Sequence, residues 1–327
     1  MLILKLGLAA GLVWWLLHSG RLELSQLSRV GERWHWLLLA QLPFAVLLTL
    51  LTLRWNLLLR VQGIAARVRD TAALTLIGWF FNQMVLGTTG GDVVKAYAIA
   101  VEHPQRRGAA ITSIAMDRLI GMGALLGSVL LLALPNASLV RSDPRLALYL
   151  TTVAGAAGAL AIAASALFSR RVRALLPTAL LARLPFHAAL RAVADAAYTY
   201  QRQPRALALA FALSFGVHGM TLCVNLLLTR ALVDGPIDWV PLVMLIPMAH
   251  LAMGLPINPP GALGTAEALY QLLFALAGIS QGGLICLLQR LTWYAWAVPG
   301  ALLYVARRTT RRDQVDQAGE PAAQPPV

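Results

Sequence analysis

Several features on which catalytic and metal-binding proteins depend are scarce or missing in this sequence. Its two cysteines, Cys223 and Cys286, lie in apolar segments without the spacing of a metal site, so we interpret them as small packing residues. We find no closely spaced carboxylate pair, no H-E-x-x-H or G-x-S-x-G motif, no P-loop and no Cys/His cluster. The sequence therefore predicts no hydrolytic or nucleotide-using machinery, and we expect no enzyme activity, no metal and no cofactor.

Apolar residues, in contrast, are abundant, at 58% of the 327 residues. Apolar runs recur from Met1 to Val305, which favours an all-α, polytopic membrane protein over a water-soluble core. A formal net charge of +13 would suggest nucleic acid in a soluble chain, but nearly all basic residues fall in the short segments between apolar runs. We therefore expect membrane lipids as partners and no nucleic acid.

A membrane-spanning helix needs about twenty apolar residues. The first candidate, at 2–18, lacks the small-residue cleavage pattern of a signal peptide, so we interpret it as a retained span, with a removed signal peptide as the alternative. We assign 1–312 to an integral membrane domain and 313–327, which has little apolar content, to a disordered cytoplasmic tail. The six predicted full spans are 2–18, 34–59, 109–134, 146–168, 206–229 and 283–306.

Two further apolar stretches, 71–101 and 239–280, are broken in the middle. The first contains Asn82, Gln83 and a glycine-rich turn that ends before Asp92, and the second contains Asn258 among five prolines. We interpret both as re-entrant helical hairpins, each of which enters and leaves the membrane on one side. The sequence thus predicts about six full spans and two hairpins.

The distribution of arginine supports this topology. With two re-entrant hairpins, sixteen arginines face the cytoplasm, among them those of the loop 169–205, and six face outward. If each broken stretch crossed the membrane fully, that basic loop would face outward, against the positive-inside preference. We therefore place both termini in the cytoplasm, the first hairpin entering from inside and the second from outside. This is the pattern of an inverted-repeat transporter, although the two halves show no convincing residue-level repeat.

Each hairpin contains the start of a short helix within the membrane. Thr89 precedes Asp92 by three residues, a capping-box spacing that predicts a helix over 90–101. Gly264 and Glu267 have the same spacing and predict a helix over about 265–278. Unsatisfied backbone N–H groups at membrane depth are tolerated only against protein or a wet cavity. Both turns are therefore candidate positions for a polar groove.

Other polar or small residues in the spans have simpler interpretations. Gly123 and Gly127 form a G-x-x-x-G pair, and residues 154–166 are rich in small side chains, so both predict close helix packing. His218 and His250 are isolated, and we interpret them as packed, hydrogen-bonded imidazoles rather than ligands.

Ionisable residues at membrane depth are costly and are usually functional or paired. Lys95 lies one turn beyond Asp92, so the two could form a local ion pair. Alternatively, Lys95 and the N–H groups around Gly90 and Gly91 hold an anion, as helix N-termini do. We favour the anion site, because burying the pair for stability alone would gain little. Asp92 would repel an anion, so we expect it to cap the helix and orient Lys95.

Three further charged positions fall inside predicted spans. Asp117 and Arg118 are adjacent, hence about 100° apart on a helix, and cannot both face one partner. Arg118 could bind a phosphate in bidentate fashion or extend to the cytoplasmic interface. Arg290 lies about a third of the way along the last span, and Glu267 is its natural partner, with a lipid headgroup as the rival.

Four motifs together resemble a known family. The sequence is similar to the flippase-like family that includes the transmembrane region of lysylphosphatidylglycerol synthases, over most of the chain. The Gly-Gly-Asp-hydrophobic-basic turn is matched by residues 90–95, and the Asp-Arg within a span by 117–118. The Pro-Gly-x-x-Gly-x-x-Glu turn is matched by 260–267, and the arginine that precedes the aromatic residues of the last span by Arg290. The segments that carry the resemblance are GTTGGDVVKAYAIA, ITSIAMDRLIGMGALL, PPGALGTAEALYQLLFALAG and LLQRLTWYAWAVPGALLY.

The resemblance implies a multi-pass protein of the bacterial inner membrane that moves lipids between leaflets. The cargo would be an anionic phospholipid, an aminoacylated lipid or a polyprenyl-phosphate-type lipid. Only a short tail follows the last span, so we do not expect the aminoacyl-transferase activity of the bifunctional synthases. The alternatives are an accessory protein, with a lipid-synthesis enzyme as its partner, and a lipid-modifying enzyme.

Combining the two lines of reasoning, we expect a hydrated groove between the hairpins in which Lys95, Arg118 and Arg290 replace the water around a lipid phosphate. The predicted substrate-binding residues are Thr89, Gly90, Gly91, Asp92, Lys95, Arg118, Glu267 and Arg290, with Asn82, Gln83, Asp117 and Asn258 as further polar residues of the groove.

Overall fold

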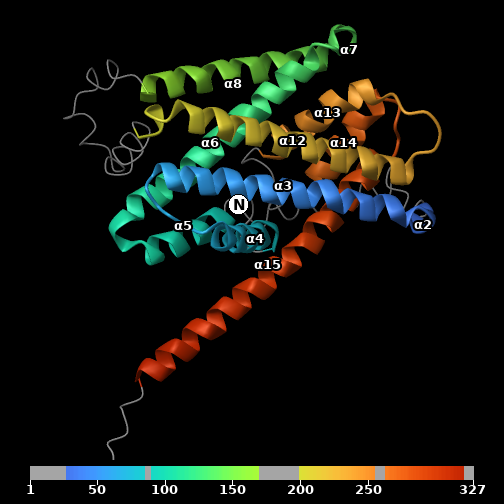
Figure 1. The fold of residues 1–327 in the computed structure, drawn as a ribbon. Helices are drawn as coiled ribbons and strands as arrows, with labels where there is room; N and C mark the ends of the chain where they lie inside the picture. Colours follow the sequence, from blue (N-terminus) through green and yellow to red (C-terminus); the bar gives the residue numbers. More distant parts are fainter. Residues whose placement is uncertain (1–26, 85–89, 169–198, 255–261, 320–327) are drawn as a thin grey trace, which may run out of the picture.

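The computed structural model describes residues 27–84, 90–168, 199–254 and 262–319, and over these ranges the chain is helical, without a strand (Figure 1). The predicted all-α class is confirmed. The elements are α2 (Leu27–Glu32), α3 (Trp34–Val61), α4 (Val68–Met84), α5 (Gly90–Glu102), the 3-10 helix η3 (Pro104–Arg106), α6 (Arg107–Ala133), α7 (Ala137–Ser142), α8 (Pro144–Phe168), α12 (Pro204–Leu232), α13 (Trp239–Met253), α14 (Thr265–Leu276) and α15 (Gly282–Gly319).

Five of the six predicted spans fall within described helices to within one residue, and the first, 2–18, lies outside the described residues. Within the part of the chain that the structure describes, four segments are long and apolar enough to cross a membrane: Trp34–Val61, Pro104–Ala133, Pro144–Ala163 and Pro204–Leu232. The last predicted span, 283–306, lies within α15, whose early turns carry the polar residues Gln289 and Arg290. The chain is therefore a multi-pass membrane protein.

The two broken stretches form helix pairs. α4 packs against α5, and α13 packs against α14. With 13, 15 and 12 residues, α5, α13 and α14 are each shorter than the helix of about 20 residues that a bilayer crossing requires. The short helices predicted over 90–101 and 265–278 are confirmed to within two residues. The turns that hold Thr89 and Asn258 lie outside the described residues.

The carboxyl-terminal boundary differs from the prediction. α15 continues to Gly319 and extends beyond the bundle (Figure 1), so it includes the first residues of the predicted tail. Residues 309–318 contain neither glycine nor proline, so nothing in that segment stops the helix.

α3 and α12 form the centre of the bundle, where they pack side by side in opposite directions (Figure 1). Arg33, before α3, pairs with Asp234, after α12. At the other end, the hydroxyl of Tyr200 donates a hydrogen bond of 3.1 Å to the carbonyl of Leu58. Leu47, Leu48, Val224 and Leu228 are buried between the two helices.

Close packing through glycine occurs at one of the two predicted places. A Cβ on Gly123 or Gly127 would lie 3.3 or 3.5 Å from the ring of Phe211 or Phe215, so α6 and α12 are close there. Among the described residues, a Cβ on Gly155 or Gly158 in α8 would meet no other part of the protein within 4 Å. The small-residue prediction is therefore wrong for α8 within this part of the chain, because α8 lies at the edge of the bundle and packs through its larger side chains, Leu146, Leu150 and Val153.

Candidate functional site

The amino-terminal end of α5 is held tightly against α4. A Cβ on Gly91 would collide with the backbone of Gly78, so two glycines allow the helices to approach here. The side-chain Oδ1 of Asn82 accepts a hydrogen bond of 2.7 Å from the Gly91 N–H, and Gln83 beside it is half-buried. In this structure the Gly91 N–H is thus already bonded and not directed at an anion. Asn82 and Gly91 shape the start of α5.

Lys95 is a buried cation with an unusual environment. The residue is 8% exposed, and its ammonium lies 4.3 Å from the centre of the Trp55 ring and 3.9 Å from the nearer oxygen of Asp92. It makes no hydrogen bond with any residue that the structure describes. An ammonium has three donors, and leaving them unbonded at low dielectric is costly. The cation–π contact and the distant carboxylate offset only part of that cost.

Asp92 is shared between two cations. Its second oxygen accepts a hydrogen bond of 2.5 Å from Nε of Arg118, a residue of α6. The side chain of Arg118 is 51% exposed, whereas that of Asp92 is 16% exposed. Asp92 therefore holds Arg118 and orients Lys95, and one of these cations faces outward from the bundle.

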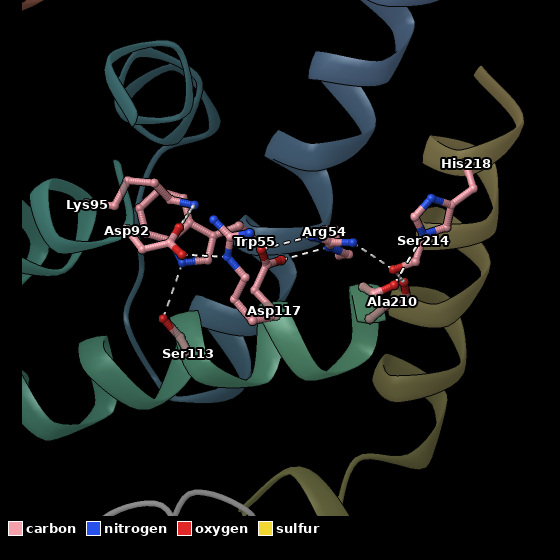
Figure 2. Close-up of polar contacts among 11 residues, drawn as sticks. Arg54, Trp55, Asp92, Lys95, Ser113, Asp117, Ala210, Ser214 and His218 are labelled. Carbon is pink, nitrogen blue, oxygen red and sulfur yellow. Dashed lines mark hydrogen bonds and ion pairs between the residues drawn. The ribbon is translucent and has the colours of Figure 1, made fainter. Parts of the chain in front are cut away.

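Arg54 and Asp117 form a second ion pair nearby (Figure 2). Nε and Nη2 of Arg54 donate to the two carboxylate oxygens of Asp117 at 2.7 and 2.9 Å, and Nη1 donates to Ser214 at 2.8 Å. Both charged residues are at most 7% exposed. Arg54 is not among the site residues predicted from the sequence, although an arginine inside the span 34–59 is a signal that indicates such a site.

The geometry confirms that Asp117 and Arg118 face different partners, since Asp117 binds Arg54 and Arg118 binds Asp92. The imidazole of His218 is a packed, hydrogen-bonded group as predicted, with Nε2 at 3.2 Å from the carbonyl of Gly121. Figure 2 shows it beside Ser214, at the α12 side of the Arg54 pair.

The charges of this region do not balance. Arg54, Lys95 and Arg118 contribute three positive charges, and Asp92 and Asp117 contribute two negative ones. Among the residues that the structure describes, this polar cluster therefore carries one net positive charge inside a membrane protein. We name these five residues the Lys95 site.

Glu267 and Arg290 meet in the other half of the bundle, as predicted. Nε of Arg290 donates to Oε1 of Glu267 at 2.5 Å, and Nη2 donates to the carbonyl of Ala262 at 2.9 Å. Oε2 of Glu267 accepts a hydrogen bond of 2.7 Å from the Gly264 N–H, which confirms the predicted cap of α14. The two side chains are 2% and 5% exposed. This pair is sealed, and contact of Arg290 with a headgroup stays a prediction.

A neutral polar network adjoins this pair, and two of its members, Tyr270 and Gln289, were not among the polar residues predicted from the sequence. The hydroxyl of Tyr270 lies 2.6 Å from Oε1 of Gln289 and 3.0 Å from Oδ1 of Asn225. Nδ1 of His250 is 3.0 Å from the carbonyl of Ile246, and its Nε2 is 2.7 Å from the Gln289 amide nitrogen, so His250 is hydrogen-bonded as predicted. The amide of Gln289 and the phenol of Tyr270 lie inside apolar helices, and that placement is the sequence signal that indicates a buried polar network.

Within residues 27–84, 90–168, 199–254 and 262–319, no group of three or more His, Cys, Asp and Glu side chains could hold a metal ion. Cys223 and Cys286 are both unpaired thiols.

Comparisons with known proteins give one family assignment. Searches among curated proteins and among solved structures found no match. The family described as "Lysylphosphatidylglycerol synthase TM region" matches residues 2–300, which is most of the chain. The match includes every residue of the Lys95 site and the Glu267–Arg290 pair. The chain therefore belongs to the family of lysylphosphatidylglycerol synthase transmembrane regions.

Proposed function

We propose that this protein moves an anionic lipid between the two leaflets of the bacterial inner membrane and that Lys95 binds the lipid phosphate. The observation that carries the proposal is the buried ammonium of Lys95, which has no hydrogen-bond acceptor among the described residues and lies 3.9 Å from its nearest carboxylate. Buried charges in membrane proteins are paired, or they line the route of a charged substrate.

A phosphodiester would complete the Lys95 site. It carries one negative charge, which matches the net charge of the three cations and two carboxylates. Its oxygens would accept the unused donors of Lys95. Arg118 is bonded to the same carboxylate as Lys95 and is half-exposed, so the pair presents two cations to one ligand. Arg54 and Asp117 already satisfy each other and support the site from behind.

The depth of the site favours transport over simple surface binding. In the predicted topology the Glu102 end of α5 faces the cytoplasm, and Lys95 lies about 10 Å from that end at 1.5 Å per residue. A headgroup that reaches Lys95 has therefore left the interface while its chains stay in the bilayer. The phosphate loses its water at that depth, and protein cations compensate for the lost hydration. They therefore lower the free-energy barrier to moving the headgroup across the membrane.

The contacts also refine the roles of the predicted residues. Gly78 and Gly91 bring α4 and α5 together, Asn82 caps α5, and Asp92 positions the two cations. Lys95 and Arg118 are then the groups that touch the phosphate.

Transport in proteoliposomes tests the proposal. The purified protein is reconstituted with phosphatidylglycerol that carries a fluorescent acyl chain, and a membrane-impermeant reductant reports how fast the lipid leaves the inner leaflet. Lys95→Gln should slow this movement by about ten- to hundredfold, equivalent to about 1.5–3 kcal/mol for a lost charge-assisted hydrogen bond. Lys5→Gln removes the only other lysine and is the matched control.

Each result is informative. Normal transport by the Lys95→Gln protein would refute the role of Lys95. A chemically altered lipid would indicate an enzyme, and a wild-type protein without transport activity would indicate an accessory role.

A further inference from the structure

The two halves of the bundle have the same plan. A long helix, a pair of short helices and a second long helix follow one another as α3, α4–α5 and α6, and again as α12, α13–α14 and α15. The first members of the two sets, α3 and α12, pack against each other in opposite directions. Two copies of one plan with opposite directions are the arrangement of an inverted repeat.

Contacts between the halves are reciprocal. α4 of the first half packs on α15 of the second, where the indole N–H of Trp79 donates to the carbonyl of Trp293 at 3.0 Å. α13 of the second half packs on α6 of the first, where Met244 and Met248 share a buried cluster with Leu126. Each helix pair thus contacts the last long helix of the other half.

The polar contacts correspond residue by residue. Asp92 is the third residue of α5 and is bound by Arg118 of the next long helix, and Glu267 is the third residue of α14 and is bound by Arg290 of the next long helix. Both arginines follow a polar residue, Asp117 or Gln289, which also takes part in the polar contacts.

The position of Lys95 has a counterpart as well. Tyr270 lies three residues after Glu267, as Lys95 lies three residues after Asp92. Lys95 contacts Trp55 of α3, and Tyr270 contacts Asn225 of α12, the corresponding long helix of its own half. Matched positions therefore make matched contacts in the two halves, although the side-chain types differ.

The two sites differ in exposure. The side chain of Arg118 is 51% exposed, whereas that of Arg290 is 5% exposed and is bonded to both Glu267 and the Ala262 carbonyl. In the predicted topology, α5 leads to the cytoplasm and α14 leads to the outside. The site in the first half thus has one half-exposed arginine, whereas both charged side chains of its counterpart in the second half are buried.

From this correspondence we propose that Arg290 and Glu267 form a second phosphate site, closed in this structure, that opens toward the outer leaflet when a lipid phosphate replaces Glu267 on Arg290. The proposal rests on the proposed function and adds a second site, with its ligand class and the contact that closes it. Arg290 offers the bidentate donors that suit a phosphate, and Tyr270 and Gln289 supply neutral polar groups beside it.

Cysteine accessibility tests this opening. Ala266, next to Glu267, is fully buried. Ala266→Cys is made in a chain with Cys223→Ala and Cys286→Ala, and it is exposed in proteoliposomes to a membrane-impermeant thiol reagent added from outside. Ser142→Cys, on the exposed end of α7, reports orientation and reagent access.

In phosphatidylcholine alone, labelling of the Ala266→Cys variant should be slow. Phosphatidylglycerol should raise its labelling rate by about fivefold or more, the lower end of typical couplings between a ligand and a conformation. The labelling rate of the Ser142→Cys variant should stay the same in both lipids. If Ala266→Cys does not fold, Ala268→Cys on the same helix takes its place.

If phosphatidylglycerol does not change the labelling rate of the Ala266→Cys variant, the second site is refuted. Glu267–Arg290 is then a structural ion pair that stays closed. If the wild-type protein still moves lipid and Lys95→Gln does not, this inference alone fails. If the wild-type protein moves no lipid, the proposed function fails instead.

Discussion

The buried ion pair Arg54–Asp117 should contribute strongly to the stability of the protein. Asp117→Asn keeps the shape of the side chain but removes the charge that two nitrogens of Arg54 contact at 2.7 and 2.9 Å. Since Arg54 is 5% exposed, its guanidinium would keep Ser214 as a partner but lose its counter-charge. Breaking a buried ion pair on one side costs about 3–5 kcal/mol, so we expect a loss of stability in that range.

The assay is unfolding of the purified protein in mixed micelles, followed by near-UV circular dichroism. A matched control is Asp70→Asn, because the Asp70–Arg307 pair is 3.7 Å apart with side chains 47% and 38% exposed. Removing this exposed ion pair should lower the free energy of unfolding by less than about 1 kcal/mol. Arg54→Gln combined with Asp117→Asn should cost clearly less than the sum of the single changes, since no buried charge is then left alone. Equal losses for Asp117→Asn and Asp70→Asn would refute the reasoning.

Two further predictions concern packing and the second polar network. Gly91→Ala should destabilise the protein by about 1–3 kcal/mol because its methyl group meets the backbone of Gly78, whereas Gly155→Ala, with open space around it, should have little effect in the same unfolding assay. Tyr270→Phe should cost about 1–3 kcal/mol by leaving a buried Gln289 oxygen without its donor, and an unchanged unfolding midpoint would contradict this role.

Hydrophobic patterning and turn residues predicted most of the fold. The lengths of the apolar runs predicted the positions of the long helices, and the glycines and prolines at the two interruptions predicted those of the short helices. The cap formed by Glu267 on Gly264 was predictable because it is local in sequence. The partner of Glu267 was also predictable, since few cations lie at membrane depth and Arg290 was the natural one.

Contacts between distant helices were harder to predict. Asp92 and Lys95 share one helix, so the sequence indicates their pairing directly, yet the shorter contact of Asp92 is with Arg118 of another helix. Sequence spacing does not show which helix faces which. The role of Arg54 is not evident from the sequence for a related reason: its long apolar helix resembles an ordinary membrane span until the contact with Asp117 is known.

The repeat was visible in the sequence only as an order of elements. Lys95 corresponds to Tyr270 and Trp55 to Asn225, so the chemistry has changed while the contacts between matched helices remain. The repeat between the two halves is therefore not evident from the residue types, but it is evident from the positions of these residues and their contacts.

Contact between the ammonium of Lys95 and a lipid phosphate can be measured directly. Lys5 and Lys95 are the only lysines of the chain, so a Lys5→Gln protein grown with ¹⁵N-lysine carries a single labelled ammonium. Solid-state NMR of that protein in phosphatidylglycerol bilayers measures dipolar coupling between the Lys95 nitrogen and ³¹P. Direct contact, at about 2.8 Å between nitrogen and a phosphate oxygen, predicts clear dephasing of the nitrogen signal. A Lys95 signal that shows no coupling to phosphorus would contradict the account.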